Sequence, residues 1–178
     1  MVPLSPATVD RIRALFAEHE VAQAERMLSE GCAESLPLWS DSSPSGLERV
    51  RFAAIRLSGG DLSRLTEGIR LAHVDWRDLL VSAGFAEDVG AHKSWTPRRF
   101  EPGVVARWLR GERIEGVAFA AGSVVQVSCG PYRSNSAFPG PAGKIVELTG
   151  LEPEPRFTVQ LNDGGSVEVF QFAIRHAG

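Results

Sequence analysis

The stretch Ser45–Gly60, SGLERVRFAAIRLSGG, predicts a single helix and marks both of its ends. We expect Ser45 to cap the first turn, because Glu48 follows three residues later and completes the pattern of a capping box. Gly59 and Gly60 should end the helix, since glycine readily adopts the left-handed conformation of a C-terminal cap.

Apolar side chains cover more than one face of this predicted helix. One stripe at helical spacing consists of Val50, Ala53, Ala54 and Leu57. Phe52 and Ile55 point to other faces. Because a helix that is apolar on several faces is usually enclosed by neighbours, we expect this one at the centre of a helical domain.

Further helices are predicted on both sides of the central one. Ser5-Pro6 opens the first, because proline suits the first helical position. After the central helix, Asp61 and Asp75 each stand where an N-cap is expected, and an apolar stripe follows each of them. These patterns together predict a helical bundle over residues 1–97.

The next stretch, residues 98–121, carries charges of both signs and is not rich in glycine and serine. Val104–Arg110 has the composition for two helical turns, with Trp108 and Leu109 as apolar anchors. We therefore expect an ordered connector rather than a flexible linker.

From residue 122 onward the pattern changes from helical to alternating. Val125 and Val127 alternate with polar residues, and so do Phe157 and Val159. Asn162–Gly165 predicts a hairpin turn, because such turns need residues that tolerate positive φ. Several short strands with one apolar face predict a small closed or nearly closed barrel over residues 122–178. The expected fold class is therefore α+β, a helical bundle followed by a β-barrel.

A resemblance to a known family rests on two pieces of this region, Gly122–Tyr132 (GSVVQVSCGPY) and Gly143–Val146 (GKIV). They resemble the KOW type of SH3-like barrel, in which a strand, a Gly-Pro-aromatic turn and a glycine precede a second strand. The resemblance implies a five-stranded barrel that contacts RNA or protein. The chain departs from the family at Arg133–Ala142, which is longer than the family's tight loop.

The helical part has a resemblance of its own. Asp75–Leu80 (DWRDLL) and Ala83–Ala86 (AGFA) are similar to segments of uncharacterised bacterial proteins. This resemblance implies no activity.

The amino-acid composition and net charge are typical of an ordinary globular protein. The 178 residues are 43% hydrophobic and 23% charged, with a net charge of −3. That charge argues against a protein built mainly to hold nucleic acid or anionic lipid. No run is long enough to span a membrane, and Met1–Pro6 lacks a basic segment followed by an apolar core, so we expect a cytoplasmic protein.

The two cysteines, Cys32 and Cys129, are too few and too isolated for a disulfide framework or a closed zinc site. We expect both to be small buried apolar residues.

One cluster of polar residues has the composition of a metal or acid–base site: His73, Asp75, Asp78, Glu87, Asp88 and His92. A structural interpretation accounts for them better. Asp75 and Asp78 suit the first turn of a helix, and His73 can bond to a helix end. The spacing of metal-binding histidines is missing, as are nucleophile-elbow and phosphate-loop motifs. We therefore expect no enzyme activity, no metal and no cofactor.

The charge of residues 122–178 also helps to distinguish a nucleic acid partner from a protein partner. From residue 122 onward, the basic residues are Arg133, Lys144, Arg156 and Arg175, and the acidic ones are Glu147, Glu152, Glu154, Asp163 and Glu168. This slightly acidic balance is not typical of RNA-binding or DNA-binding domains. A protein or peptide partner fits better, because the loop after the first strand carries aromatic residues and prolines.

The candidate binding residues are Tyr132, Arg133, Phe138, Lys144 and Arg156. Two alternatives stay open. The barrel could bind RNA through its basic residues, or Tyr132 and Phe138 could fold back as a lid over the barrel.

Overall fold

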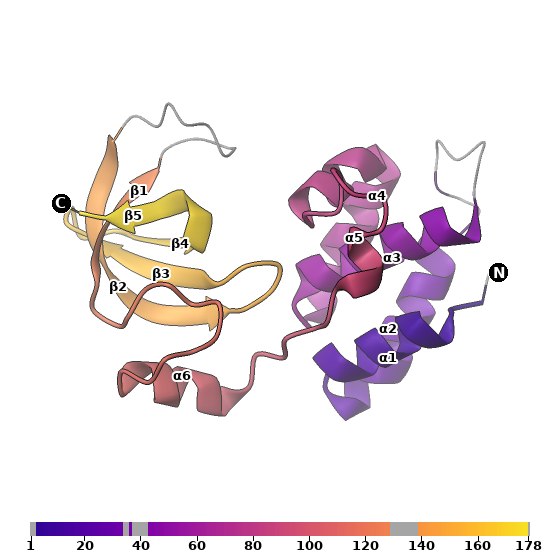
Figure 1. Ribbon diagram of the computed structural model, residues 1–178, viewed down its shortest axis with the longest axis horizontal. Helices are drawn as coiled ribbons and strands as arrows, with labels where there is room; N and C mark the ends of the chain where they lie inside the picture. The colour runs from indigo at the N-terminus through magenta and orange to yellow at the C-terminus, as the bar shows by residue number, and fades with distance from the viewer. Residues whose placement is uncertain (1–2, 34–35, 37–42, 129–138, 178) are drawn as a thin grey trace. The chain divides into compact units, whose positions relative to one another are not determined.

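The computed structural model describes residues 3–33, 36, 43–128 and 139–177. The chain divides into two compact units, Met1–Arg99 and Phe100–Gly178. The first is helical and the second contains all five described strands (Figure 1). The α+β class expected from the sequence is confirmed.

The first unit consists of α1 (Pro6–Leu15), α2 (Glu18–Gly31), α3 (Pro44–Ser58), α4 (Leu62–Ser82) and the short α5 (Ala91–Ser94). At its centre lies α3, which contacts α1, α4 and α5. Val50, Ala53, Ala54 and Ile55 are each 0% exposed, and they lie on several faces of the helix. The prediction of an enclosed central helix is thus confirmed.

Close approach of α3 and α4 depends on small residues. A Cβ added to Gly68 of α4 would lie only 3.3 Å from the Cα of Ala54 in α3. Larger side chains at this crossing would push the two helices apart, so the small residues allow them to pack tightly.

The ends of α3 agree only in part with the prediction. The helix ends at Gly59, whose φ of 57° and ψ of 21° are left-handed, as expected. At the other end, Ser43 caps the helix instead of Ser45, because its hydroxyl accepts the Gly46 N–H and the next residue is a proline preset for the first turn. The predicted capping box is wrong, since the Glu48 carboxylate accepts a hydrogen bond from the hydroxyl of Ser5.

Two helical segments make up α4, as the sequence predicts. Asp61 caps the first, with its Oδ1 2.9 Å from the Arg64 N. At Asp75 the backbone leaves the helical region, with φ −154° and ψ 100°, and its Oδ1 accepts the Arg77 N–H at 2.9 Å. Among the described residues, neither α4 nor another helix is long and apolar enough to cross a membrane.

The second unit is built on an antiparallel sheet of β1 (Val124–Ser128), β2 (Pro139–Gly150), β3 (Arg156–Leu161), β4 (Ser166–Phe170) and β5 (Ile174–His176). The strand order is β4-β3-β2-β1-β5, and the 3-10 helix η1 (Gln171–Ala173) leads into β5. No pairing in the described part of the chain joins β4 to β5. The sheet is therefore open, where the sequence led us to expect a closed or nearly closed barrel.

The turn between β3 and β4 is the one that Asn162–Gly165 predicts. The Gly164 N–H donates to the Leu161 carbonyl at 3.1 Å, and the Leu161 N–H donates to the Gly165 carbonyl at 2.8 Å. Gly164 has a φ of 93°, which explains the need for glycine there. This geometry fixes the register of the two strands.

One face of the sheet, which we name the core face, is buried by the segment that precedes β1. That segment contains α6 (Pro102–Leu109), whose Trp108 is 2% exposed and packs on Phe157 with ring centroids 6.1 Å apart. The Trp108 indole N–H donates to the Phe119 carbonyl at 2.8 Å. From Phe100 on, the expected connector therefore belongs to the core of the second unit. Leu109, the other expected anchor, is 57% exposed.

Candidate functional site

Two of the five candidate binding residues, Lys144 and Arg156, fall within the described part of the chain. Both lie on the side of the sheet opposite the core face, which we name the exposed face. The other three candidates, Tyr132, Arg133 and Phe138, lie outside the described residues. The site is therefore built here from the exposed face alone.

Strand register decides which side chains are neighbours on this face. Lys144 of β2 lies opposite Val124 of β1 and Gln160 of β3. Arg156 lies opposite Phe170 of β4. Lys144 and Arg156 are therefore four residues apart along β3, or about 13 Å at the rise of a β-strand.

Between these two cations runs a row that carries two carboxylates. Thr158 of β3 pairs with Glu147 of β2 on one side and with Glu168 of β4 on the other. The Thr158 hydroxyl lies 3.4 Å from Glu147 Oε2, and the Thr149 hydroxyl donates to Glu168 Oε1 at 2.7 Å. We name Glu147, Thr158 and Glu168 the acidic row. It lies between Lys144 and Arg156.

Arg156 lies against the sheet rather than projecting into solvent. Its guanidinium carbon is 5.9 Å from the centroid of the Phe170 ring, and its Nε is buried. Gly150 makes room for it, because a Cβ at that position would lie 2.5 Å from Arg156 Nη2. A guanidinium held in this way is poorly placed to reach a phosphate.

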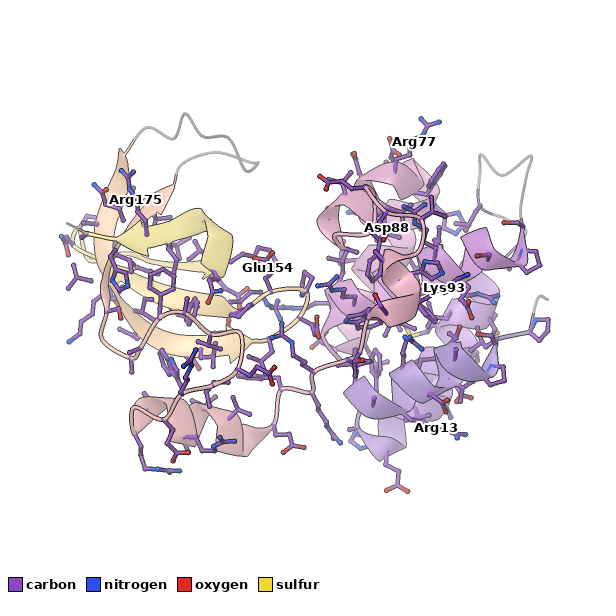
Figure 2. The ribbon with its side chains drawn as sticks, viewed as in Figure 1. Arg13, Arg77, Asp88, Lys93, Glu154 and Arg175 are labelled. Carbon is purple, nitrogen blue, oxygen red and sulfur yellow. The ribbon has the colours of Figure 1, made fainter. Side chains whose placement is uncertain are left out.

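The other two basic side chains of this face, Arg175 and Lys144, differ in their contacts with neighbouring residues. Arg175 of β5, labelled in Figure 2, donates to the carbonyl oxygen of the Gln126 amide, which lies 3.1 Å from its Nε and 2.9 Å from its Nη2. Lys144 is exposed, and its Cε lies beside Gly122, 3.2 Å from where a Cβ would stand. Of the three cations that the structure describes on this face, Lys144 and Arg175 are exposed and Arg156 is half-buried.

Two apolar side chains flank Lys144. Val124 lies directly opposite it and is 56% exposed, and Val146, two residues further along β2, is 44% exposed. Sequence reasoning missed both valines as surface residues. Alternation indicates that a strand has two faces, but it does not reveal which residues of different strands lie together.

The cluster of histidines and acids in the helical unit has the structural roles that the sequence favours. His73 Nε2 lies 2.8 Å from the Gly31 carbonyl at the end of α2. Asp88 Oδ1 accepts the Gly90 N–H at 2.7 Å. Within the described ranges, no three His, Cys, Asp or Glu residues are grouped so that they could hold a metal ion.

The thiol of Cys32 is fully buried, as expected, and Cys129 lies outside the described residues. Burial raises the pKa of Cys32 to about 12, against a smaller opposing effect of Arg51. The thiolate is therefore scarce near neutral pH, and Cys32 is not suited to nucleophilic chemistry.

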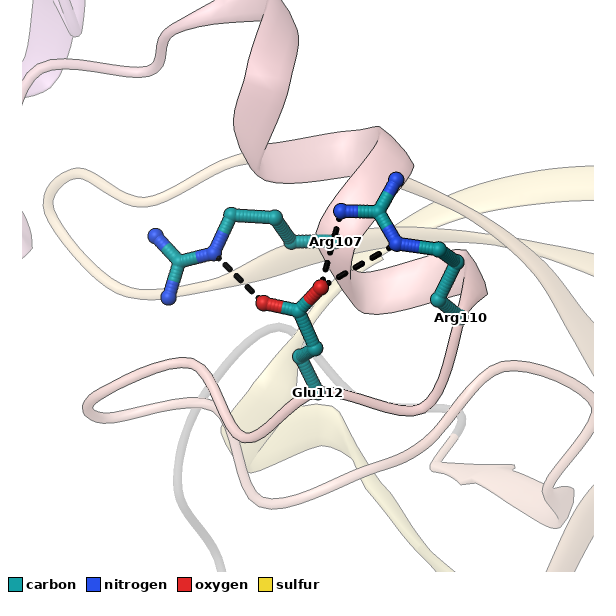
Figure 3. A network of polar contacts seen from close by, with 3 residues as sticks. All are labelled: Arg107, Arg110 and Glu112. Atoms are coloured by element: carbon teal, nitrogen blue, oxygen red, sulfur yellow. Dashed lines mark hydrogen bonds and ion pairs between the residues drawn. The ribbon is translucent and has the colours of Figure 1, made fainter.

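A third polar group, on the surface of the second unit, joins Arg107 and Arg110 to Glu112 just beyond α6 (Figure 3). Glu112 Oε2 lies 2.9 Å from Arg107 Nε, and its Oε1 lies 2.8 Å from Arg110 Nη2. Hydrogen bonds from Arg107, and then from Arg110, lower the pKa of the Glu112 carboxyl. Glu112 therefore offsets one of the two positive charges, and the group keeps a net charge of +1.

Comparison with known proteins assigns neither a family nor a function, because no protein-family model matches the chain and no curated protein is similar to it. The interpretation of the exposed face therefore depends on its geometry and charge.

Proposed function

We propose that the chain is a non-enzymatic binding protein whose second unit contacts a protein partner. The unit would be a small SH3-like domain, which is supported by its five antiparallel strands and by the return of β5 to the side of β1. The proposal includes a cytoplasmic location, in keeping with the sequence.

The acidic row is the observation that carries this proposal. Nucleic acid binding needs several cations that follow a phosphate backbone. Here the acidic row lies between Lys144 and Arg156, so a phosphate chain that joined the two cations would cross it beside the carboxylate of Glu147. A protein partner can instead match alternating charges with its own. RNA binding of the KOW type is thus the weaker alternative.

The exposed valines also favour a protein partner over RNA. Val124 and Val146 place apolar surface on either side of Lys144, and protein interfaces commonly combine an apolar centre with a charged rim. Tyr132 and Phe138, in the segment between β1 and β2, would contribute further aromatic contacts, since aromatic side chains are enriched among the residues that dominate binding.

The test is affinity purification with the full chain, followed by binding measurements with the recovered partner. Val146→Asp would place a charge in the centre of the proposed contact, while Val89→Asp makes the same substitution at a site that is 70% exposed in the helical unit. We expect Val146→Asp to weaken binding at least tenfold and Val89→Asp to leave it unchanged. Tyr132→Ala and Phe138→Ala should also weaken it.

Two results would count against the proposal. One is a partner whose affinity is the same for wild type, Val146→Asp and both loop variants. The other is nucleic acid as the only saturable ligand of the full chain. Each variant must first show the same melting temperature as wild type, so that a loss of binding is not a loss of folding.

A further inference from the structure

The histidine of α5 is buried inside an aromatic cluster of the helical unit. His92 is 0% exposed, and its ring meets Phe52 of α3 at 5.6 Å and Phe85 at 6.4 Å, edge-on in both cases. Trp95 contacts the same two rings at 6.2 and 6.0 Å. The imidazole is thus one of four packed rings rather than a surface group.

This environment favours the neutral imidazole. Both ring nitrogens of His92 are buried, and neither has a side-chain hydrogen-bond partner among the described residues. Burial lowers the pKa of His92 from its ordinary 6.5. A hydrogen bond with the backbone of Val89 and the carboxylate of Glu48 oppose this shift, while Lys93 and Arg49 make smaller contributions that lower the pKa.

The charged groups around the cluster are mainly cations. They are Arg11 of α1, Glu48 and Arg49 of α3, Arg56 of α3, which lies over the Phe85 ring, and Lys93 of α5. Glu48, the only carboxylate in this set, also accepts a hydrogen bond from Ser5. A proton on His92 would therefore add a positive charge to a ring that already has Lys93 and Arg49 near it.

Arg49 and Arg11 also donate hydrogen bonds to the backbone of the segment that carries His92. Arg49 donates to the carbonyls of Phe85, Ala86 and Asp88, and Arg11 donates to those of Lys93 and Trp95. Residues 86–90 between these anchors are exposed (Asp88 and Lys93 are labelled in Figure 2). The segment 85–95, which includes α5, is therefore held by the packing of its His92 and Trp95 rings on Phe52, by Arg49 of α3 and by Arg11 of α1.

We propose that His92 is an acid-sensitive latch, whose protonation releases the segment 85–95 from α3 and exposes the aromatic rings beneath it. The latch concerns the helical unit and does not depend on the function proposed for the sheet. Because Phe52 is itself in the core of the bundle, opening would present an apolar surface that is covered at neutral pH.

The direction of the pH dependence follows from proton linkage. Once released, His92 would regain its ordinary pKa of 6.5, so the open state binds more protons than the closed state below about pH 7. The closed state therefore loses stability as the pH falls through this value. For one proton the opening constant rises at most about tenfold per pH unit, and the rise stops below the lowered pKa of the closed state.

Hydrogen exchange of the full chain, read by mass spectrometry between pH 7.5 and 5 and corrected for intrinsic rates, tests the latch. We expect protection of the segment 85–95 to fall with pH while that of α3 persists. In His92→Phe the protection should not change over this range. His19→Phe, at an exposed position of α2, should behave like wild type.

A second measurement needs no variant, in case His92→Phe does not fold. The pH titration of the His92 ring protons by NMR should give a pKa below 6.5, and the same transition should increase the fluorescence of a dye that binds apolar surface. Protection that does not depend on pH, an equal pH dependence in folded His92→Phe, or titration of His92 at or above 6.5 would overturn the proposal.

Discussion

At the residue scale, the helical unit depends on small side chains in the middle of α3. Ala53 and Ala54 are completely buried, and Gly68 of α4 approaches Ala54 closely. No water can reach a group placed there, and the neighbouring side chains are apolar. A charge at either alanine would consequently remain without solvation.

Ala53→Asp should therefore unfold the helical unit. An unpaired buried charge costs several kcal/mol, a large share of a typical stability of about 5–15 kcal/mol. Ala22→Asp, at an exposed position of α2, is the matched control and should retain the far-UV circular dichroism and melting temperature of the wild type. An Ala53→Asp protein with an unchanged melting temperature would show that α3 is peripheral.

Local sequence signals predicted individual residues well where the partner is close in the chain. Gly59, Asp61 and Asp75 have their expected cap roles because the groups they satisfy are within a few residues. Glu48 was predicted wrongly because its partner is Ser5, the N-cap of α1, forty-three residues away. The contacts of His92 with Phe52 and Phe85 were also beyond prediction, since the sequence does not show which rings the fold brings together.

At the scale of elements, α6 and the residues that follow it are part of the β unit. Trp108 fills the core face of the sheet, where Phe119 and Phe157 pack around it. The sequence indicated a short helix here but not where it packs, because its apolar residues carry no information about the sheet they cover. Its neighbour Leu109 points away from that sheet and is exposed.

The adjacent residues Trp108 and Leu109 provide a matched test of this arrangement. Trp108→Ala should destabilise the second unit by about 3–5 kcal/mol, because it leaves a cavity and removes the donor of the Phe119 carbonyl. Leu109→Ala should change the free energy of unfolding by no more than about 0.5 kcal/mol. Urea unfolding monitored by circular dichroism measures both. Equal effects would mean that α6 does not pack on the sheet.

At the scale of the whole molecule, alternation predicted the strands but neither the open sheet nor the neighbours on its exposed face. Register shifts within β2 and between β1 and β2 alter the pairing, and periodicity alone cannot reveal them. Lys144 lies on β2 and Arg156 begins β3. The acidic row between them depends on register across β2, β3 and β4, so it emerges only from the structure.

Whether the exposed face binds nucleic acid can be measured by titrating a fluorescent single-stranded RNA with the full chain at about 50 mM and about 200 mM salt. We expect no saturable binding at the higher salt and no effect of Lys144→Ala. Saturable binding at the higher salt, with a salt dependence whose slope falls by about one in Lys144→Ala, would contradict this expectation.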